Sequence, residues 1–305
     1  MKIIQVQKNY KSNSKGVVAT VGFFDGVHAG HRHLISQLKQ IADKEGLPAA
    51  VITFPLHPQG ILNPTVKPSL LTSPDEKLEY LDEAGANICF IIDFTSEFSC
   101  LDAENFIKNI LHKQLNVQHL IIGYDHRFGR NREDGFDEYS QYGAECEMKV
   151  SRAEELEGEH ISSTIIRRML LAGCVEEANI MLSYSYAISG KVVHGNHLGR
   201  TIGFPTANLK IDHAEKLIPG TGIYVANIML GAEYFRGMAY IGTRPTVSHS
   251  GEQHVEVHIL NFDREIYGET LRLEFVRFIR EDRAFKNLEE LREQLIKDRD
   301  AVLLT

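Results

Sequence analysis

The sequence predicts an α/β chain of two domains: a parallel sheet with crossover helices over residues 1–182, then a small antiparallel β-barrel with a C-terminal helix over residues 183–305. Three observations lead to this prediction. The chain has 305 residues, about twice the size of a common domain. Short apolar runs alternate with helical periodicity as far as about residue 180. Beyond that point, strand-like segments follow one another without helices between them.

Five short apolar segments are predicted to form the parallel sheet. Several are apolar throughout, as strands that are covered on both faces require. They span residues 17–23, 49–54, 88–93, 119–123 and 147–150.

Three helices are predicted between these strands. The first covers about residues 30–45 and ends at Gly46, a residue type that favours helix C-termini. The second begins with the capping box Ser73-Pro74-Asp75-Glu76 and runs toward Gly85. The third follows Asp102, which can cap it. Its apolar stripe consists of Phe106, Ile107, Ile110 and Leu111.

The second domain is predicted as a barrel rather than a sandwich. Gly231-Ala232 is a two-residue link that suits a tight hairpin. Asn287, followed three residues later by Glu290, resembles a capping box and predicts a final helix. The predicted strands span residues 186–193, 223–230, 233–241, 254–260 and 271–279.

Composition argues against several classes of protein. The net charge is −8 and the pI about 6.0, so the chain lacks the basic excess that nucleic-acid binding favours. No signal-peptide pattern and no run of roughly 18 apolar residues is present, which predicts a cytoplasmic protein without a membrane span. The four cysteines form no C-x-x-C pair, so unreactive buried thiols are predicted rather than a zinc ribbon or disulfides.

Two histidines lie where the first predicted helix begins, in the string Gly22-Phe23-Phe24-Asp25-Gly26-Val27-His28-Ala29-Gly30-His31. A helix N-terminus offers free N–H donors, and imidazoles there can donate to phosphate oxygens as charge develops. Two alternatives remain open at this point. His28 and His31 are ordinary turn and cap residues in one, and metal ligands in the other, although no third ligand is evident.

This string resembles the signature of the HxGH nucleotidyltransferases, in the branch of the bacterial FMN adenylyltransferases. Two later segments resemble the same family, Gly123-Tyr124-Asp125-His126-Arg127-Phe128-Gly129 and Ile161-Ser162-Ser163-Thr164-Ile165-Ile166-Arg167. The resemblance implies a Rossmann-like domain in which His28 and His31 are catalytic. It also implies a nucleotide- and flavin-binding set: Gly22, Phe23, Asp25, Phe54, Asp125, Arg127, Phe128, Ser163, Thr164 and Arg167.

Some of these residues can also be interpreted from their chemistry alone. Ser163 and Thr164 can cap a helix and donate to phosphate, and Arg167, one turn later, can clamp a polyphosphate. Phe54 and Phe128 suit either contact with a flat ring or core packing. His126 replaces the phenylalanine that is usual in the family.

A second glycine-rich stretch, from Gly190 to Asn208, contains the run Gly199-Arg200-Thr201-Ile202-Gly203-Phe204-Pro205-Thr206-Ala207-Asn208. By itself it suits either a phosphate-binding loop or a tight barrel turn, and it lacks the G-K-[S/T] ending of a P-loop. Glu256 and His258 fall on one face of a later predicted strand. A carboxylate placed in this way can take the proton from a hydroxyl group.

The same stretch resembles the signature of the riboflavin kinases. The resemblance implies that Thr206 and Asn208 hold Mg²⁺ with ATP, roles that their neutral oxygens can fill. It implies that Glu256 is the catalytic base. The segments 242–246 and 261–268 also resemble parts of this family, although Tyr240 stands where asparagine is more usual. The remaining binding residues implied are Gly195, Gly199, Arg200, Gly203, Pro205 and Arg244.

Together the two resemblances cover nearly the whole chain, in the order of the bacterial bifunctional riboflavin kinase/FMN adenylyltransferase family, also called FAD synthetase. This implies two Mg²⁺-dependent reactions with ATP as co-substrate and with riboflavin, FMN and FAD as substrates and products. Three alternatives are an enzyme with one active half, a flavin-binding regulator without turnover, and an RNA-binding relative of the tRNA synthetases. The oligomeric state is left open, with a weak homo-oligomer as one alternative.

Overall fold

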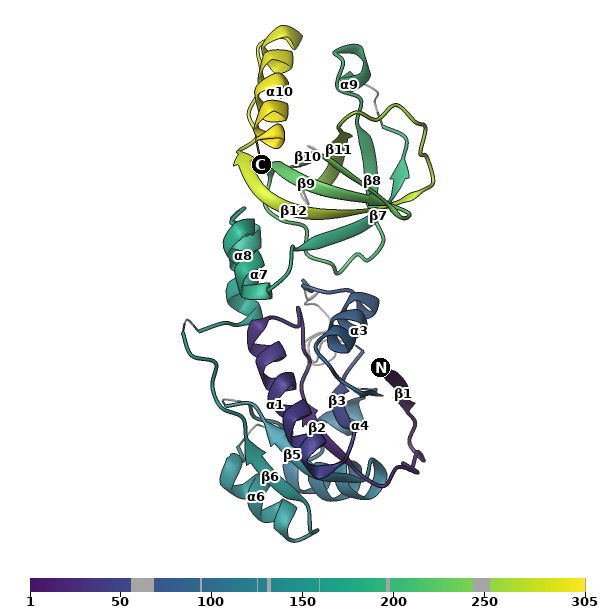
Figure 1. Cartoon of the computed structure of the whole chain (residues 1–305), viewed down its shortest axis with the longest axis vertical. Coiled ribbons are helices and arrows are strands. Elements are labelled where there is room, and N and C mark those ends of the chain that lie inside the picture. Colours follow the sequence, from purple (N-terminus) through teal and green to yellow (C-terminus); the bar gives the residue numbers. More distant parts are fainter. Residues whose placement is uncertain are drawn as a thin grey trace. The chain divides into compact units, whose positions relative to one another are not determined.

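A computed structural model shows the chain as two compact units, Met1–Ser162 and Ser163–Thr305 (Figure 1). Each unit has its own hydrophobic core. The predicted boundary between the functional domains, at residues 182 and 183, stays a prediction. The structure describes residues 1–55, 69–93, 95–124, 126–130, 133–158, 160–195, 198–243 and 253–304.

The first unit is built on a six-stranded sheet with the order β1-β4-β3-β2-β5-β6, in which every pairing is parallel. The five predicted strands are confirmed, and their ends lie within about two residues of the prediction. β1 is an additional edge strand whose side chains are mostly exposed, so it lacks the apolar run that marks the others. The strands are β1 (Lys2–Val6), β2 (Val17–Val21), β3 (Ala49–Thr53), β4 (Ile88–Ile92), β5 (Val117–Ile122) and β6 (Lys149–Arg152).

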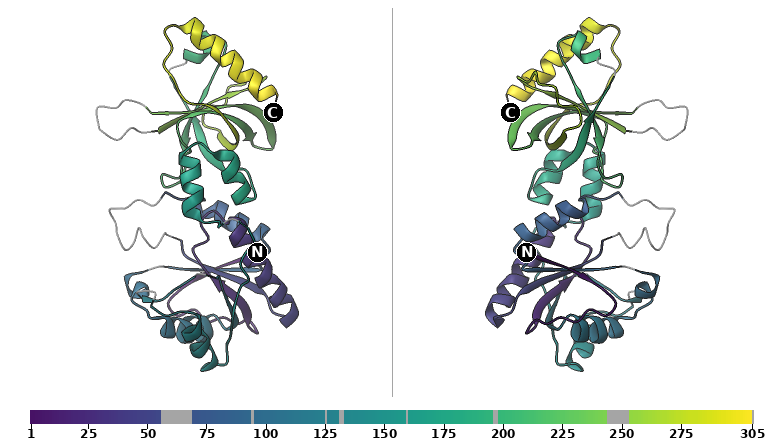
Figure 2. Two further views of the ribbon diagram at one scale, coloured as in Figure 1. Left: turned by 90° about the vertical axis from the view of Figure 1, so that its left-hand side faces the viewer. Right: turned by 90° about the vertical axis from the view of Figure 1, so that its right-hand side faces the viewer.

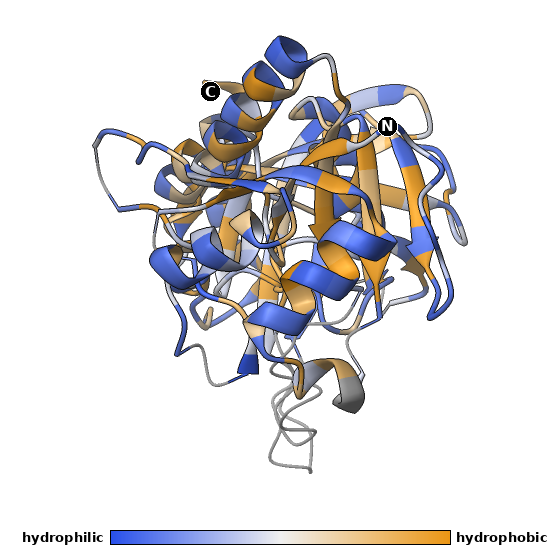
Figure 3. Cartoon of the chain, turned by 90° about the horizontal axis from the view of Figure 1, so that it is seen from below, coloured by the Kyte–Doolittle hydropathy of each residue, from blue (hydrophilic) through white to orange (hydrophobic). Residues whose placement is uncertain are grey.

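Helices cover both faces of this sheet, which explains why its central strands are buried throughout (Figure 2). α1 (Ala29–Glu45) packs on β2 and β3. On the other face, η1 (Phe106–Gln114) and α6 (Phe136–Ala144) pack on β5 and β6 and share one core cluster. α6 was not predicted. Figure 3 shows apolar residues concentrated on the strands and polar residues on the outward sides of the helices.

The predicted helix boundaries are confirmed by their caps. The capping box at the start of α3 (Pro74–Glu83) is complete: Ser73 Oγ accepts from the Glu76 N–H at 3.2 Å, and the Glu76 carboxylate accepts from the Ser73 N–H at 2.8 Å. Gly46 ends α1 in the left-handed conformation, at φ +67°. Asp102 caps α5 (Ala103–Asn105). A shorter helix, α4 (Ser96–Ser99), precedes it.

The third predicted helix is present but differs in type. From Phe106 to Gln114 it is a π-helix, and at its end the Leu115 N–H donates to the Ile110 carbonyl, five residues back, at 2.9 Å. The wider winding still buries Phe106, Ile107 and Leu111. An apolar stripe therefore predicted the helix and its buried face, but not its pitch.

The second unit begins with α7 (Ser163–Leu171) and α8 (Val175–Leu182) and continues as a closed antiparallel barrel of order β10-β11-β8-β7-β12-β9. The predicted barrel is confirmed. β8 was not predicted, because it begins inside the glycine-rich stretch that we interpreted as a loop. The barrel strands are β7 (Ala187–Val193), β8 (Ala207–Ile211), β9 (Gly222–Leu230), β10 (Glu233–Thr243), β11 (Gln253–Ile259) and β12 (Thr270–Arg280).

Two local predictions for this unit are also confirmed. Gly231 and Ala232 link β9 to β10, whose register pairs Glu233 with Leu230. α10 (Leu288–Leu303) begins after Asn287, whose side chain accepts from the Glu290 N–H at 2.8 Å, and the helix packs on β9 and β10. In an ideal capping box, the Glu290 carboxylate would accept from the N–H of the N-cap residue Asn287. Here it accepts from the N–H of Lys286, one residue earlier.

The prediction that the cysteines are buried is wrong for two of them. Cys100 and Cys174 are exposed, Cys146 is half-buried and Cys89 is buried, and all four are free thiols. The spacing of the cysteines excluded a disulfide framework but carried no information on exposure. Among the residues that the structure describes, no helix combines the length and apolar character needed to cross a bilayer.

Candidate functional site

The loop that joins β2 to α1 has an unusual backbone. Phe24, Gly26 and Val27 have φ angles of +56°, +81° and +35°. Positive φ is uncommon for a β-branched residue such as valine and costs about 1–3 kcal/mol for each non-glycine residue. Such a loop persists only where its surroundings hold it, and strain of this kind concentrates at functional sites.

Asp25 is one of the groups that hold this loop. Its carboxylate is 3% exposed and accepts hydrogen bonds from the backbone N–H groups of Leu71, at 2.9 Å, and Thr72, at 3.2 Å. In return, the Gly26 N–H donates to Thr72 Oγ1 at 3.2 Å. Asp25 therefore joins the loop to the segment that leads into α3, a contact that its predicted ligand-binding role did not include.

His28 and His31 lie together at the start of α1. His28 is the N-cap residue, and its Nδ1 accepts from the His31 N–H at 3.3 Å. The two rings are stacked, with centroids 3.7 Å apart and planes 16° apart. Because Nδ1 of His28 is an acceptor, the proton of the neutral ring is on Nε2. The pair therefore presents an imidazole donor at a helix N-terminus.

His31 is neutral at physiological pH. Burial, followed by the electrostatic influence of His28 and His126, lowers its pKa well below the ordinary 6.5. Within the described part of the chain, its Nδ1 is buried without a hydrogen-bond partner. A buried polar atom left in this state is a candidate contact for a ligand.

The predicted aromatic contacts lie in the core of the first unit. Phe54 is 8% exposed and packs edge-on against Phe98, with centroids 5.6 Å apart. Phe128 stacks on Tyr139, with centroids 4.2 Å apart. Core packing, the alternative left open for both residues, accounts for these contacts. Their flavin-binding roles stay predictions.

The other predicted residues of the first site occupy different parts of the chain. Gly22 follows β2, and its N–H donates to the Ile52 carbonyl at 3.0 Å. Arg127 is exposed. Asp125 lies outside the described residues. α7, a helix of the second unit, begins at Ser163 and contains Thr164 and Arg167, so the predicted helix start is confirmed.

In the barrel, Glu256 and Thr206 are in direct contact. Thr206 Oγ1 donates to Glu256 Oε2 at 3.0 Å. Strand pairing explains the meeting, because the register of β11 and β8 sets Glu256 opposite Asn208. The three residues that resemblance named as base and metal ligands are therefore brought together, and they supply a hydroxyl, an amide carbonyl and a carboxylate oxygen.

The glycine-rich loop approaches Asn208 closely. A Cβ atom on Gly195 would lie 2.1 Å from the Asn208 amide nitrogen, so any larger residue there would displace the Asn208 side chain. After α9 (Leu198–Thr201), Gly203 adopts φ +84°, and the Phe204 N–H turns back to the Gly199 carbonyl at 2.9 Å. These contacts fold the loop back over the start of β8. The predicted binding residue Arg244 lies outside the described residues.

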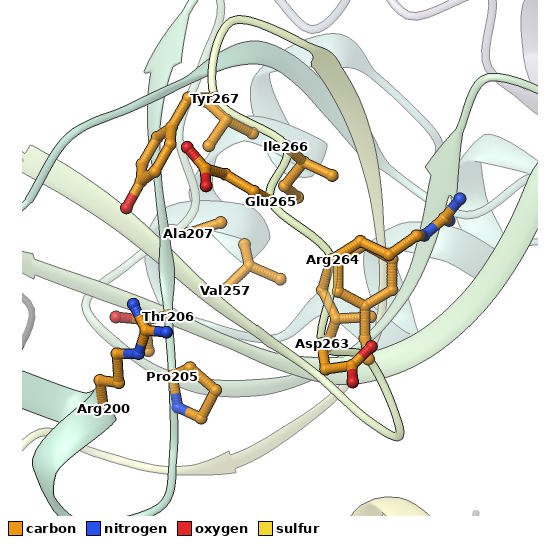
Figure 4. Close-up of a pocket in the computed structure, with 13 residues that line it drawn as sticks. Arg200, Pro205, Thr206, Ala207, Val257, Asp263, Arg264, Glu265, Ile266 and Tyr267 are labelled. Atoms are coloured by element: carbon orange, nitrogen blue, oxygen red, sulfur yellow. The ribbon is translucent and has the colours of Figure 1, made fainter.

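A pocket of about 330 Å³ adjoins this loop. Figure 4 shows Arg200, Pro205 and Thr206 on one side and Asp263 and Arg264 on another. Residues 263–267 were not among the predicted site residues, although the segment 261–268 resembles the riboflavin kinases, which was the available signal. The residues that line the pocket are Val192, Arg200, Pro205, Thr206, Ala207, Val257, Ile259, Phe262, Asp263, Arg264, Glu265, Ile266 and Tyr267.

Tyr240, the unusual residue of the second site, pairs with Glu256 across β10 and β11. Its hydroxyl donates to the Asp282 carboxylate at 2.8 Å. Burial, with this contact, raises the pKa of Tyr240 above its ordinary value. The ring lies edge-on to His254, whose Nε2 is 3.9 Å from Glu256 Oε1. The tyrosine therefore anchors a strand position beside the candidate base.

The oxygen atoms that Thr206 and its neighbours offer suit a hard cation as ligands. Within the described residues, no cluster of three or more His, Cys, Asp or Glu side chains has a metal-binding arrangement. Thr206 offers a hydroxyl oxygen and Asn208 an amide carbonyl oxygen, beside the carboxylate of Glu256. Mg²⁺ prefers oxygen ligands and keeps several waters, so these residues fit it.

Comparison with known proteins gives two family matches. A model described as FAD synthetase matches residues 10–165, and one described as riboflavin kinase matches residues 182–303. Three curated proteins called bifunctional riboflavin kinase/FMN adenylyltransferase are similar over nearly their full lengths. The Listeria monocytogenes protein is 39% identical over 92% of this chain and 90% of its own. The Escherichia coli K12 protein is 37% identical over 98% of this chain and 96% of its own. The Bacillus subtilis protein is 34% identical over 96% of this chain and 93% of its own.

A solved structure has the same architecture. A crystal structure from Streptococcus pneumoniae, described as a macrolide-efflux protein, matches with a TM-score of 0.88 and 32% sequence identity. The match covers 99% of both chains. The fold of this chain is therefore shared with an experimentally determined structure.

Proposed function

The chain belongs to the bifunctional riboflavin kinase/FMN adenylyltransferase family, and from this premise we propose that it makes FAD from riboflavin in two ATP-dependent steps. The barrel phosphorylates riboflavin to FMN. The parallel-sheet domain transfers AMP from ATP to FMN and releases pyrophosphate. Because both steps consume ATP, we further propose that the enzyme works in the cytoplasm.

The observation that carries the kinase assignment is the 3.0 Å hydrogen bond between Thr206 and Glu256, beside a pocket that Thr206 lines. In the proposed reaction, the Glu256 carboxylate accepts the proton of the terminal ribityl hydroxyl. The hydroxyl oxygen bonds to the γ-phosphorus of ATP, the bond from that phosphorus to the bridging oxygen breaks, and ADP leaves. Phosphoryl transfer requires mainly such positioning and charge stabilisation.

Thr206 and Asn208 would hold Mg²⁺ in this site, beside the carboxylate of Glu256. When bound, Mg²⁺ offsets the negative charge of the phosphates. The chain's own contribution is to fix these oxygens: Thr206 donates to one oxygen of Glu256, and β-strand pairing sets Asn208 opposite. The pocket lined by Arg200 and residues 263–267 is the proposed nucleotide-binding site, because Arg200 can neutralise phosphate charge.

For adenylyl transfer, we assign charge stabilisation to His28 and His31. A phosphate oxygen of FMN bonds to the α-phosphorus of ATP, and the bond from that phosphorus to the bridging oxygen breaks, so that pyrophosphate leaves. Neutral imidazoles at a helix N-terminus can donate to phosphate oxygens on which charge accumulates. The stacked pair and the low pKa of His31 support this role.

One incubation tests both assignments. The purified full chain is incubated with riboflavin, ATP and Mg²⁺, and flavins are separated by chromatography. We expect FMN and then FAD. Glu256→Gln should lower FMN formation by about 10²–10⁴-fold. His28→Asn keeps an N-cap acceptor and should halt the reaction at FMN, with FAD formation lowered by about 10²–10³-fold.

Matched controls separate these effects from a general loss of structure. Glu293→Gln and His213→Asn replace exposed residues of the second unit and should leave both products unchanged. If the wild type binds riboflavin but leaves it unphosphorylated under oxidised and reduced conditions, the proposal fails in favour of a flavin-binding regulator. If FMN accumulates without FAD in the wild type, only the kinase half stands.

A further inference from the structure

A buried lysine lies beneath the loop that carries the histidines. Lys77, on α3, is 6% exposed, whereas lysine is almost never buried to this degree without partners. Its Nζ donates to the Phe54 carbonyl at 2.8 Å and to the Phe23 carbonyl at 3.4 Å. The same nitrogen lies 4.4 Å from the centroid of the Phe23 ring. All three contacts favour the charged ammonium.

These carbonyl groups lie just beyond the carboxyl ends of two adjacent central strands. Phe23 follows β2 and Phe54 follows β3. The Phe23 carbonyl also accepts from Thr53 Oγ1 at 3.1 Å. Ligands of open α/β sheets bind at this edge. Lys77 therefore cross-links two strand ends at the place where the candidate site begins.

α3 is attached to the same loop a second time through Asp25. The Asp25 carboxylate holds the N–H groups of Leu71 and Thr72, directly before the capping box of α3. The part of the loop between Phe23 and His28 contains the positive φ angles of Phe24, Gly26 and Val27. Lys77 and Asp25 therefore hold two points of this strained segment, which ends at His28, the N-cap of α1.

A lysine occupies this position although burying a lysine is unfavourable. Burial lowers the pKa of Lys77 to about 8, against the opposing influence of Asp25 and Cys89, the titratable groups that face it from the loop and from β4. A methionine would fill similar space without that penalty. The presence of a cation at this buried position points to a requirement for its charge or its hydrogen bonds.

We propose that Lys77 is a positioning residue for adenylyl transfer, whose ammonium holds the carbonyl oxygens of Phe23 and Phe54 and so keeps the strained loop in the conformation that presents His28 and His31. This inference rests on the proposed function of the parallel-sheet domain. It assigns Lys77 no contact with substrate.

The test compares Lys77→Met with the wild type in the full chain. Lys39→Met is the matched control, because Lys39 is a half-buried lysine on α1 whose described ion pair is with the exposed carboxylate of Asp43. FMN formation and FAD formation are measured in the same preparations, with kcat and KM for each. Amide hydrogen exchange is followed in peptides over residues 22–31 and over β5.

We expect Lys77→Met to lower kcat for FAD formation by about 30-fold or more, with KM for ATP and FMN within about threefold. FMN formation should be unchanged. Exchange should quicken over residues 22–31 and stay unchanged over β5, because the loop loses its anchor while the sheet remains. Lys39→Met should match the wild type in every measurement.

Three outcomes would overturn the proposal. The first is FAD formation in Lys77→Met within about threefold of the wild type. The second is a loss of activity with quicker exchange over β5 as well, which indicates a general structural role. The third is failure of both Lys77→Met and Lys77→Arg to fold, which has the same meaning. If the wild type makes no FAD, the proposed function fails, and the exchange comparison still decides whether Lys77 holds the loop.

Discussion

At the scale of single residues, the protonation of His31 links the chemistry of the first site to its stability. Its pKa is held well below 6.5 by burial and by His28 and His126, so the folded protein keeps this ring neutral. In the unfolded chain the same ring takes up a proton as the pH falls through about 6.5. The unfolded state therefore binds more protons below that pH, and the free energy of unfolding should fall.

We predict that wild type loses more stability than His31→Gln when the pH is lowered from about 7.5 to about 5.5. The variant lacks the ring whose protonation opposes folding. Urea unfolding at both pH values measures the difference. His213→Gln, at an exposed position of the second unit, should behave like the wild type. Equal acid sensitivity of wild type and His31→Gln would contradict the prediction.

The same scale shows what sequence could predict of the sites. The string from Gly22 to His31 predicted that two histidines meet at a helix start, because a helix cap is a local feature. The partners of Asp25 could not be predicted, since Leu71 and Thr72 are 46 and 47 residues away and reach it only through folding. The role of Lys77 could not be predicted either, because the carbonyl groups of Phe23 and Phe54 are 54 and 23 residues away and reach it only through folding.

At the scale of elements, local signals at helix ends were the most informative. Ser73 and Glu76 predicted the start of α3, and the capping box is present. Two strands escaped prediction, as did the helix α6. β1 is mostly exposed, so it lacks the apolar run of a covered strand. β8 has five residues and begins within a glycine-rich run. The π-helix was predicted only as a helix, because its apolar stripe resembles that of an α-helix.

For the capping box we predict that Ser73→Ala lowers the free energy of unfolding of the first unit by about 1 kcal/mol. The Glu76 N–H loses its hydrogen-bond acceptor, so the first turn of α3 becomes less stable. Urea denaturation measures the change, and Ser73→Asp, which keeps an acceptor, should restore most of it. A loss in Ser73→Asp as large as that in Ser73→Ala would show that the cap is not the cause.

At the scale of the whole molecule, two compact units with separate cores suggest separate unfolding steps. We predict two calorimetric transitions. ADP with riboflavin and Mg²⁺ should raise only the transition of the barrel unit, by about 2.7 kcal/mol of stability at a ligand concentration of 100 times Kd.

Glu256→Gln and Ser73→Ala assign the transitions to the two units, since each variant changes one of them. Removal of the ligands by dialysis should return the barrel transition to its starting temperature. A single transition that shifts as a whole with ligand would contradict the prediction of separate steps.

The closed barrel has a further consequence, for self-association. Strand addition between copies requires a sheet edge with unpaired N–H and C=O groups. In the described structure the barrel strands form a closed ring and offer no such edge, whereas the parallel sheet ends in β1 and β6. β1 also carries Ile3, whose side chain is 52% exposed. Aggregation through strand pairing in the folded protein should therefore begin at the first unit, and charged substitutions on β1 are the place to suppress it.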